Sequence, residues 1–205
     1  MGNAIRRGLL QLLYLKEKQS KQEIADLLKC SVHRVSYWMD RYQIPTRTIS
    51  DAVYAKKNPN GDPFKLNLPK TLTQAELFGM GMGLFWGEGN KVDRSSVRLG
   101  NTDPDLIITF IKFLETFFSI RKEDIRFGLQ IFSDTSPQIA QRFWTKALGV
   151  NKSQFMKIIV TPPRSRGNYK RKSKYGVLTI YYLNSRLQKL LLSMLCKKSR
   201  FIVPL

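Results

Sequence analysis

The chain has 205 residues, of which 42% are apolar, so it can form one medium domain or two small ones with their own cores. Its 35 lysines and arginines against 15 acidic residues give a formal net charge of +20, which predicts a polyanionic partner, most often nucleic acid. Two distant cysteines, Cys30 and Cys196, and a single histidine, His33, exclude the usual zinc spacings and argue against a disulfide framework.

The N-terminal segment carries no long apolar run of the kind found in secretory signals. The isolated cysteines read as small apolar fillers, which fits a reducing cytosol. We therefore expect a cytoplasmic, DNA-associated protein with no membrane partner.

Positive charge is concentrated toward the C-terminus. After Asp134 the chain has no acidic residue but carries fifteen lysines and arginines, whereas residues 1–65 hold twelve basic and six acidic ones. Charge that served only solubility would be spread more evenly. The C-terminal third is therefore expected to lie along a phosphate backbone.

Residues 1–48 read as a small helical domain. An apolar helix comes first. A capping box at residues 20–23 opens a second helix through Leu28, and Ser31 caps a third helix that ends near Tyr42.

The last two of these helices have the apolar spacing of a helix-turn-helix, with a small residue at the helix crossing and Val35 and Trp38 as buried positions: Ile24, Ala25, Leu28, Val35 and Trp38. The resemblance to helix-turn-helix domains covers about residues 20–42, and Lys29 stands where glycine is common in the turn. An ordinary helical hairpin has similar spacing. A basic and polar outward set on the last helix nevertheless suits a reader of the DNA major groove: His33, Arg34, Ser36, Tyr37 and Arg41.

Residues 49–70 have the composition of a linker. Asn58 to Pro63 is a dense turn signal, and a short helix is expected around residues 50–57. A second domain, residues 71–205, follows.

This second domain begins with a glycine-rich helix that ends on a carboxylate. Each interior glycine costs roughly 1 kcal/mol relative to alanine, so such residues are kept where side chains would block a contact. Gly79, Gly83 and Gly87 recur every four residues on one face, which a second helix can approach closely. A capping box at residues 73–76 opens the helix. Glu88 closes it, where the helix dipole disfavours an anion unless a cation compensates.

Residues Gly81 to Gly89 resemble the signature helix of the LAGLIDADG homing endonuclease family in their small residues, apolar pair and closing acid–glycine pair. In that family two such helices pack at an interface, and each delivers an acidic residue to divalent metal ions at the scissile phosphates. The resemblance implies that Glu88 binds Mg²⁺ and that Gly79, Gly83 and Gly87 form a homodimer interface. A buried helix with an incidental glutamate would have a similar sequence. A phosphate-binding loop would need a Lys-Ser/Thr pair, which is missing, and a membrane-spanning helix would need about 20 apolar residues, which this stretch does not have.

Alternating and helical periodicities beyond the glycine-rich helix predict four strands, at residues 95–101, 125–131, 155–161 and 175–183, and three helices, at 106–118, 136–148 and 185–196. The element order is similar to that of the LAGLIDADG fold, with one strand pair split by helix 136–148, and the resemblance covers roughly residues 73–196. The expected fold class is α+β: a helix-turn-helix domain followed by a four-stranded antiparallel sheet with helices covering one face.

The uncovered face of such a sheet would lie against double-stranded DNA. Alternation assigns four residues to it, although ordinary solvated strand positions would look the same: Arg98, Arg126, Gln130 and Lys157. A basic loop at residues 162–174 cannot bury itself, so phosphate contact is expected there, with a nuclear localisation tract as the weaker interpretation. Its basic residues are Arg164, Arg166, Lys170, Arg171, Lys172 and Lys174.

Catalytic members of the family usually keep a lysine, and often a glutamine, in strands beside the metals. Aligned strand ends place these positions near residues 181–182 and 100–101, and neither expected residue is present. Asn101 offers a polar substitute, and Lys91 could reach inward. Two functions therefore stay open. The first is a homodimeric, Mg-dependent DNA endonuclease of homing type with Glu88, Asn101 and Lys91 as candidate catalytic residues. The second is a DNA-binding transcription regulator that does not cut, and an RNA-binding role is a remote third.

Overall fold

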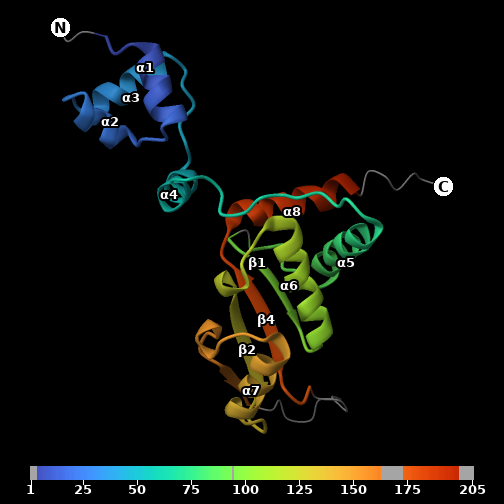
Figure 1. Ribbon diagram of the computed structural model, residues 1–205. Coiled ribbons are helices and arrows are strands. Elements are labelled where there is room, and N and C mark those ends of the chain that lie inside the picture. Colours follow the sequence, from blue (N-terminus) through green and yellow to red (C-terminus); the bar gives the residue numbers. More distant parts are fainter. Residues whose placement is uncertain (1–3, 94, 163–172, 199–205) are drawn as a thin grey trace. The chain divides into compact units, whose positions relative to one another are not determined.

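A computed structural model describes residues 4–93, 95–162 and 173–198 of the chain. The chain divides into two compact units, residues 1–63 and 64–205, here called unit 1 and unit 2 (Figure 1). Unit 1 is helical and unit 2 combines helices with a sheet, so the α+β class expected from the sequence is confirmed. Among the described residues, every helix is too short or too polar to cross a lipid bilayer.

Three helical segments form the core of unit 1. The first, α1 (Arg7–Gln11), continues as a π-helical turn, η1 (Leu12–Lys16), and is followed by α2 (Lys21–Leu27) and α3 (Val32–Arg41) (Figure 1). Their buried residues form one small core with Ile5 before α1 and Ile44 after α3. The helical members are Leu10, Leu13, Tyr14, Ile24, Ala25, Val35 and Met39.

The core of unit 1 differs from expectation at one position of α3. Trp38 was expected to be buried, but it is only half-buried and stacks on Tyr42. Met39 is fully buried instead, because it lies one helical turn after Val35 on the same face.

The ends of α2 and α3 are fixed by side-chain caps. Ser20 accepts a hydrogen bond from the Glu23 amide, and the Glu23 carboxylate accepts one from the Ser20 amide at 2.6 Å, so the predicted capping box is confirmed. Ser31 likewise caps α3 by accepting from the Arg34 amide. Between the two helices Lys29 has a φ of 49°, in the left-handed region that glycine usually occupies.

The short helix predicted in the linker is α4 (Ile49–Lys57), capped by Thr48 and belonging to unit 1. None of its residues is buried.

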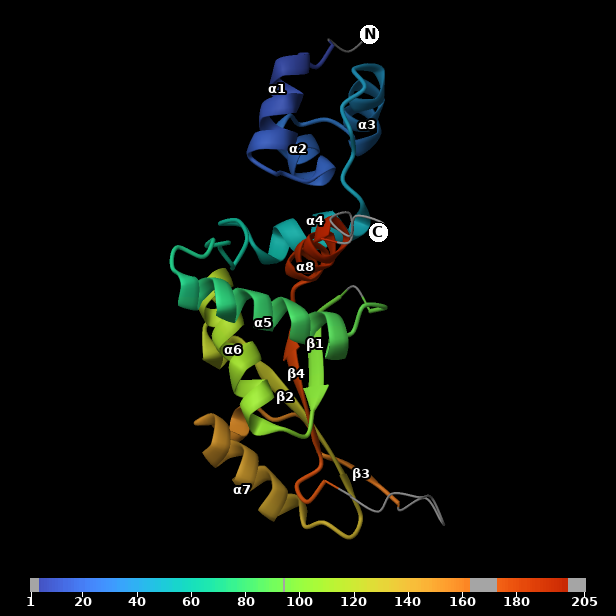
Figure 2. The same ribbon diagram turned by 90° about the vertical axis from the view of Figure 1, so that its right-hand side faces the viewer.

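Unit 2 contains one sheet of four strands in the order β1-β4-β2-β3 (Figure 2). The strands are β1 (Val97–Asn101), β2 (Arg126–Phe132), β3 (Ile159–Thr161) and β4 (Val177–Tyr182). Strand β4 runs antiparallel to β1 and β2, but β3 runs parallel to β2. The expectation of a fully antiparallel sheet is therefore wrong. The connection from β2 to β3 contains a whole helix, which returns the chain to the starting end of β2.

The remaining helices of unit 2 are α5 (Leu72–Glu88), α6 (Pro104–Phe118), α7 (Pro137–Leu148) and α8 (Ser185–Lys198), with short 3-10 turns η2 (Lys122–Asp124) and η3 (Lys152–Gln154). Figure 2 shows α5, α6 and α7 on one side of the sheet. The strand residues facing these helices are all buried: Val97, Leu99, Phe127, Leu129, Ile131, Leu178, Ile180 and Tyr182.

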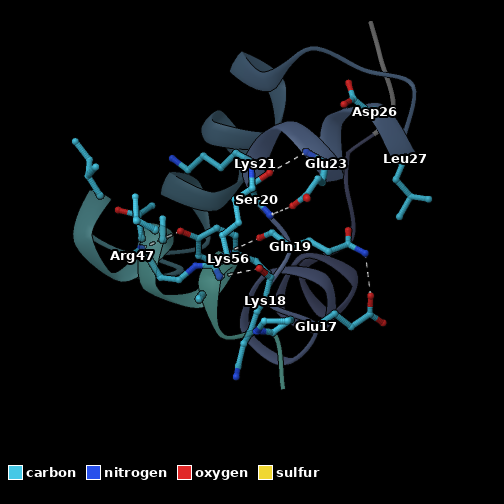
Figure 3. Close-up of a pocket in the computed structure, with 17 residues that line it drawn as sticks. Glu17, Lys18, Gln19, Ser20, Lys21, Glu23, Asp26, Leu27, Arg47 and Lys56 are labelled. Atoms are coloured by element: carbon cyan, nitrogen blue, oxygen red, sulfur yellow. Dashed lines mark hydrogen bonds between the residues drawn. The ribbon is translucent and has the colours of Figure 1, made fainter. Parts of the chain in front are cut away.

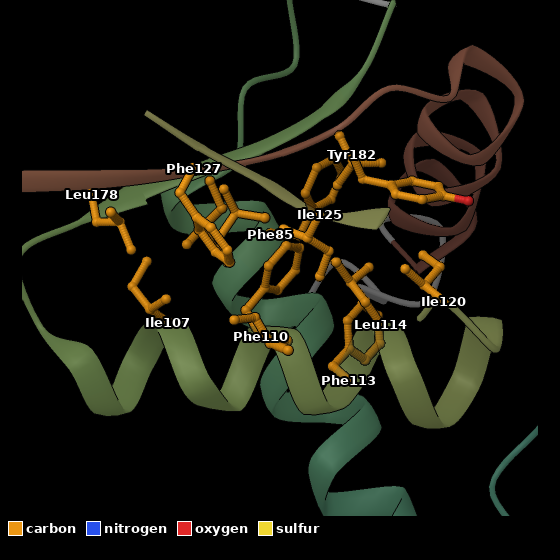
Figure 4. Packing of buried hydrophobic residues seen from close by; sticks show 14 of the residues in the cluster. Phe85, Ile107, Phe110, Phe113, Leu114, Ile120, Ile125, Phe127, Leu178 and Tyr182 are labelled. Carbon is orange, nitrogen blue, oxygen red and sulfur yellow. The ribbon is translucent and has the colours of Figure 1, made fainter. Parts of the chain in front are cut away.

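Aromatic side chains fill the layer between the helices and the sheet. Phe85 of α5 lies parallel to Phe110 of α6, with ring centres 6.4 Å apart, close to the sheet residue Phe127 (Figure 4). This core fixes α5 over the sheet and so determines where the helix ends.

Candidate nucleic-acid interface

The face of the sheet opposite α5, α6 and α7 is only partly buried, and we call it the open face. Strand pairing arranges its side chains in three rows: Arg98–Tyr181–Arg126, Gly100–Thr179–Gly128 and Val177–Gln130–Ile159. Three of the four residues predicted to face DNA therefore share this surface.

The Arg98 guanidinium is held by three neighbours. Its Nη2 atom lies 2.5 Å from the Asp93 carboxylate, and its Nε–H donates to the Ser96 hydroxyl at 2.7 Å. Its central carbon lies 5.0 Å from the centre of the Tyr181 ring. A carboxylate, a hydroxyl and a ring face thus fix both its position and its plane.

Asp93 is itself held in its charged form. The Ser95 hydroxyl and then the Ser95 amide, which both donate to its carboxylate, lower the pKa of Asp93, and Arg98 lowers it further. The carboxylate partner of Arg98 is therefore present across the neutral pH range.

Two glycines in the middle row of the open face leave room for neighbouring side chains. A Cβ at Gly128 would lie 2.9 Å from the Tyr181 ring, and one at Gly100 would lie 2.9 Å from the Thr179 hydroxyl. The Tyr181 ring thus lies over Gly128, and the Met156 methyl group, 3.3 Å from the same Cβ position, also covers it.

Arg126 and Gln130 have weaker anchors. Arg126 is exposed and donates from Nη1 to the Glu123 carbonyl at 2.9 Å, and Gln130 donates to the Thr161 hydroxyl at 3.1 Å. Their charge and amide groups remain near solvent.

Lys157, the fourth predicted residue, lies outside the strand. The expected strand at 155–161 is shorter, because η3 ends at Gln154 and alignment along β2 resumes only at Ile159. Lys157 is exposed in the connecting segment and is followed by the half-buried Ile158. The preceding residue, Met156, is exposed, and its methyl group reaches toward Gly128.

Most of the basic loop lies outside the described residues, namely Arg164, Arg166, Lys170, Arg171 and Lys172. Its last basic residue, Lys174, is described and lies 5.4 Å above the centre of the Tyr175 ring. Tyr175 stacks on Phe143 and accepts a hydrogen bond at its carbonyl from the Trp144 indole at 2.9 Å. The C-terminal end of the loop is therefore anchored to α7.

The outer surface of α3 carries the residues predicted to read DNA in unit 1. His33, Tyr37 and Arg41 are exposed, whereas Arg34 and Ser36 are half-buried. Arg41 donates to the Tyr37 hydroxyl at 3.0 Å, and its guanidinium lies 5.6 Å from the centre of the Trp38 ring. This surface therefore combines hydrogen-bonding and aromatic groups in a fixed arrangement.

The glycine face of α5 has no partner within the described chain. Atoms added as Cβ at Gly79, Gly83 or Gly87 would have nothing within 4 Å. The close helix contact is instead at Gly81, where a Cβ would overlap the Phe113 ring of α6. The helix also begins earlier than predicted, since Thr71 rather than Thr73 is the N-cap and accepts from the Gln74 amide.

Glu88 ends α5 as predicted, with an exposed carboxylate. The next residue, Gly89, forms an antiparallel bridge with Leu99, which places the Glu88 backbone across from Gly100 at the edge of β1. The other two candidate catalytic residues have local partners. Lys91 donates to the Gly89 carbonyl at 2.9 Å, and the Asn101 side-chain oxygen accepts from the Thr102 and Asp103 amides before α6.

A divalent metal is only partly supported by these residues. In the described parts of the chain, no three His, Cys, Asp or Glu side chains come together as a metal-binding group. An exposed carboxylate at the end of a helix is a suitable oxygen ligand for Mg²⁺, but one chain supplies a single such carboxylate at Glu88. The residues fit the metal only if a second copy brings its own Glu88.

A groove in unit 1 lies between the start of α2 and α4 and has a volume of about 1050 Å³ (Figure 3). Arg47 occupies one side of it, donating to the Lys18 and Gln19 carbonyls and lying 4.3 Å from the centre of the Tyr14 ring. The groove lining mixes acidic and basic residues. Its best-defined feature is therefore a clamp that ties the segment before α4 to η1.

Comparison of the chain with protein-family models, with curated proteins and with solved structures found no match.

Proposed function

We propose that the protein binds double-stranded DNA in a sequence-specific way, through α3 of unit 1 and the open face of unit 2. The observation that carries the proposal is the open face itself, which places Arg98, Arg126 and Gln130 on one surface of the sheet. Arginine and glutamine are the side chains that read guanine and adenine edges.

Overall charge supports the same partner. The net charge of +20 favours association with a polyanion, and the arginines supply donors for phosphates as well as bases. The capped helix α3 adds a second reading element of the size that fits a major groove.

Selection of bound fragments from a random duplex pool, followed by titration of the recovered sequence, tests this function. We expect a recovered consensus and much weaker binding to scrambled duplex. The variants Tyr37→Ala on α3 and Gln130→Ala on the open face should each relax the consensus at different positions. Recovery of no consensus, with equal affinity for every duplex, would contradict sequence-specific binding.

A second candidate function is hydrolysis of the bound DNA by a homodimer. It is favoured by one observation, the exposed Glu88 beside the edge of the sheet at the end of a helix whose glycine face is bare. We propose that this face packs against its copy and brings two Glu88 carboxylates together to hold Mg²⁺. When bound, the metal would stabilise charge on the phosphate oxygens.

Cleavage is tested separately from binding on the recovered target, with and without Mg²⁺. The enzyme proposal predicts strand breaks by the wild type and none by Glu88→Gln, while Glu123→Gln, another exposed carboxylate in η2, stays active. Tight specific binding without strand breaks in any condition would leave the regulator function and exclude the nuclease.

A further inference from the structure

Arg98 and Arg126 occupy the two ends of one row on the open face, with Tyr181 between them. The two guanidinium groups differ in whether a carboxylate lies beside them. Arg98 is paired with Asp93 at 2.5 Å. Among the described residues, Arg126 has no carboxylate within ion-pair distance, and its Nη1 donates to the main-chain carbonyls of Glu123 and Ile125. The same residue type therefore presents two chemistries to a ligand on this face.

The difference decides what each arginine can bind. Affinity for phosphate depends on the net positive charge that the protein places beside the phosphate. The ion pair of a guanidinium with a carboxylate has almost no net charge. Recognition of a base edge depends on the direction of the N–H donors and needs no net charge. Arg98 is therefore a poor phosphate ligand but is suited to a base edge, whereas Arg126 keeps a charge for phosphate.

The donors of Arg98 are also aligned in advance. Its Nε–H donates to Ser96 and its Nη2 pairs with Asp93, while its central carbon lies 5.0 Å from the centre of the Tyr181 ring. The Nη1 donors are not committed to any described residue and remain for a ligand. Such fixation reduces the side-chain entropy lost on binding, which otherwise offsets much of a hydrogen bond's contribution.

We propose that Asp93 is a positioning residue that makes Arg98 a reader of guanine, through its O6 and N7 acceptors, rather than a phosphate contact. This inference rests on the proposed DNA-binding function and deepens it, because it names one base in the target. Tyr181 and Ser96 complete the support, and Gly128 allows the Tyr181 ring to lie down on the sheet.

The test compares two substitutions that change the net charge equally. Asp93→Asn removes the partner of Arg98, and Asp124→Asn removes the carboxylate of the exposed Arg121–Asp124 pair in η2. Each is titrated with the selected duplex and with duplexes in which single guanines are replaced. We expect one guanine whose replacement weakens wild-type binding by roughly tenfold, from the usual worth of a bidentate base contact.

The inference predicts that Asp93→Asn and Arg98→Lys abolish most of that preference, while Asp124→Asn keeps it and Asp93→Glu restores part of it. Ser96→Ala, which removes the Nε–H acceptor without a change of charge, should weaken the preference in the same direction. Thermal unfolding of each variant accompanies the titrations, and Ser96→Ala and Arg98→Lys carry the test if Asp93→Asn does not fold.

Some outcomes would overturn the assignment while leaving the proposed function intact. Specific binding in which Asp93→Asn and Asp124→Asn have identical base preferences would show that Asp93 acts only through net charge. A guanine preference that survives in Arg98→Lys and Ser96→Ala would assign the contact elsewhere. Failure of the wild type to prefer any sequence would instead contradict the proposed function itself.

Discussion

Gly81 of α5 lies directly against the Phe113 ring of α6, so close that a Cβ on Gly81 would overlap the ring. This contact, together with the buried Met82 and Phe85, joins α5 to the core of its own chain, and the glycine face at Gly79, Gly83 and Gly87 takes no part in it. The glycines of one helix thus have two separate roles. Gly81 permits intramolecular packing, and the other three leave a surface free.

We expect Gly81→Ala to destabilise unit 2 by about 1–3 kcal/mol, the usual cost of overpacking a core, despite alanine's better helix propensity. The free energy of unfolding in urea measures it. Ala140→Gly, at a buried position of α7, is a control for general sensitivity of the core. An unchanged or higher stability of Gly81→Ala would show that α6 does not approach α5 so closely.

Gly83→Ala gives the opposite expectation for an isolated chain. The added methyl group has nothing within 4 Å, so better helix propensity should stabilise unit 2 by about 0.5–1 kcal/mol. In the proposed homodimer the same methyl group would separate the two helices and weaken association. Sedimentation over a concentration series together with thermal unfolding distinguishes these effects. Weaker association of Gly83→Ala would support the dimer, and a monomer at every concentration would contradict it.

Lys29 should be replaceable by glycine with a gain in stability. Its φ of 49° strains an L residue by about 1–2 kcal/mol, and glycine relieves this at an entropic cost of about 0.5–1 kcal/mol. We expect Lys29→Gly to stabilise unit 1 by roughly 0.5–1 kcal/mol. Hydrogen exchange of the α2 and α3 amides measures the change, and Lys29→Ala, which loses the same charge but keeps a Cβ, should show no such gain. A destabilised Lys29→Gly would contradict the observed turn.

The capping box of α2 should make unit 1 sensitive to acid. The Ser20 amide, and then the Ser20 hydroxyl, hydrogen-bond the Glu23 carboxylate and lower its pKa. A pKa that is lower in the folded state contributes stability above the unfolded value, near 4.3, and loses it as the pH falls through the folded value. Hydrogen exchange of the α2 amides should therefore speed up as the pH falls below about 4, beyond the intrinsic trend. Glu23→Gln should remove this excess, and its persistence would assign the effect to another group.

The sequence predicted most elements of the fold because their periodicities are strong. Alternation located β1, β2 and β4 to within about two residues, and capping patterns located α2 and α3. At the start of α5 two overlapping Thr-x-x-Gln/Glu patterns compete, and local sequence does not choose between Thr71 and Thr73. In the structure Thr71 is the N-cap, and the Lys70 amide supports this start of the helix by donating to the Gln74 side-chain oxygen at 2.8 Å.

Periodicity in the sequence does not predict which strands pair or in which direction they run. The parallel alignment of β3 follows from the path of the chain through α7, and its short length follows from η3, neither of which leaves a signal in alternation. The same limit applies to the candidate site. Alternation identified Arg98 on the open face, but its partners Asp93 and Ser96 depend on the conformation of the segment before β1.

DNA binding by the open face is tested most directly by the salt dependence of duplex affinity for Arg126→Ala. Loss of one phosphate contact should reduce the slope of log affinity against log salt by about one, because one fewer counterion is released. Arg121→Ala, which removes an equal charge at the N-cap of η2, is the matched control and should leave the slope unchanged. Identical slopes for the wild type, Arg126→Ala and Arg121→Ala would contradict the claim that DNA lies on the open face.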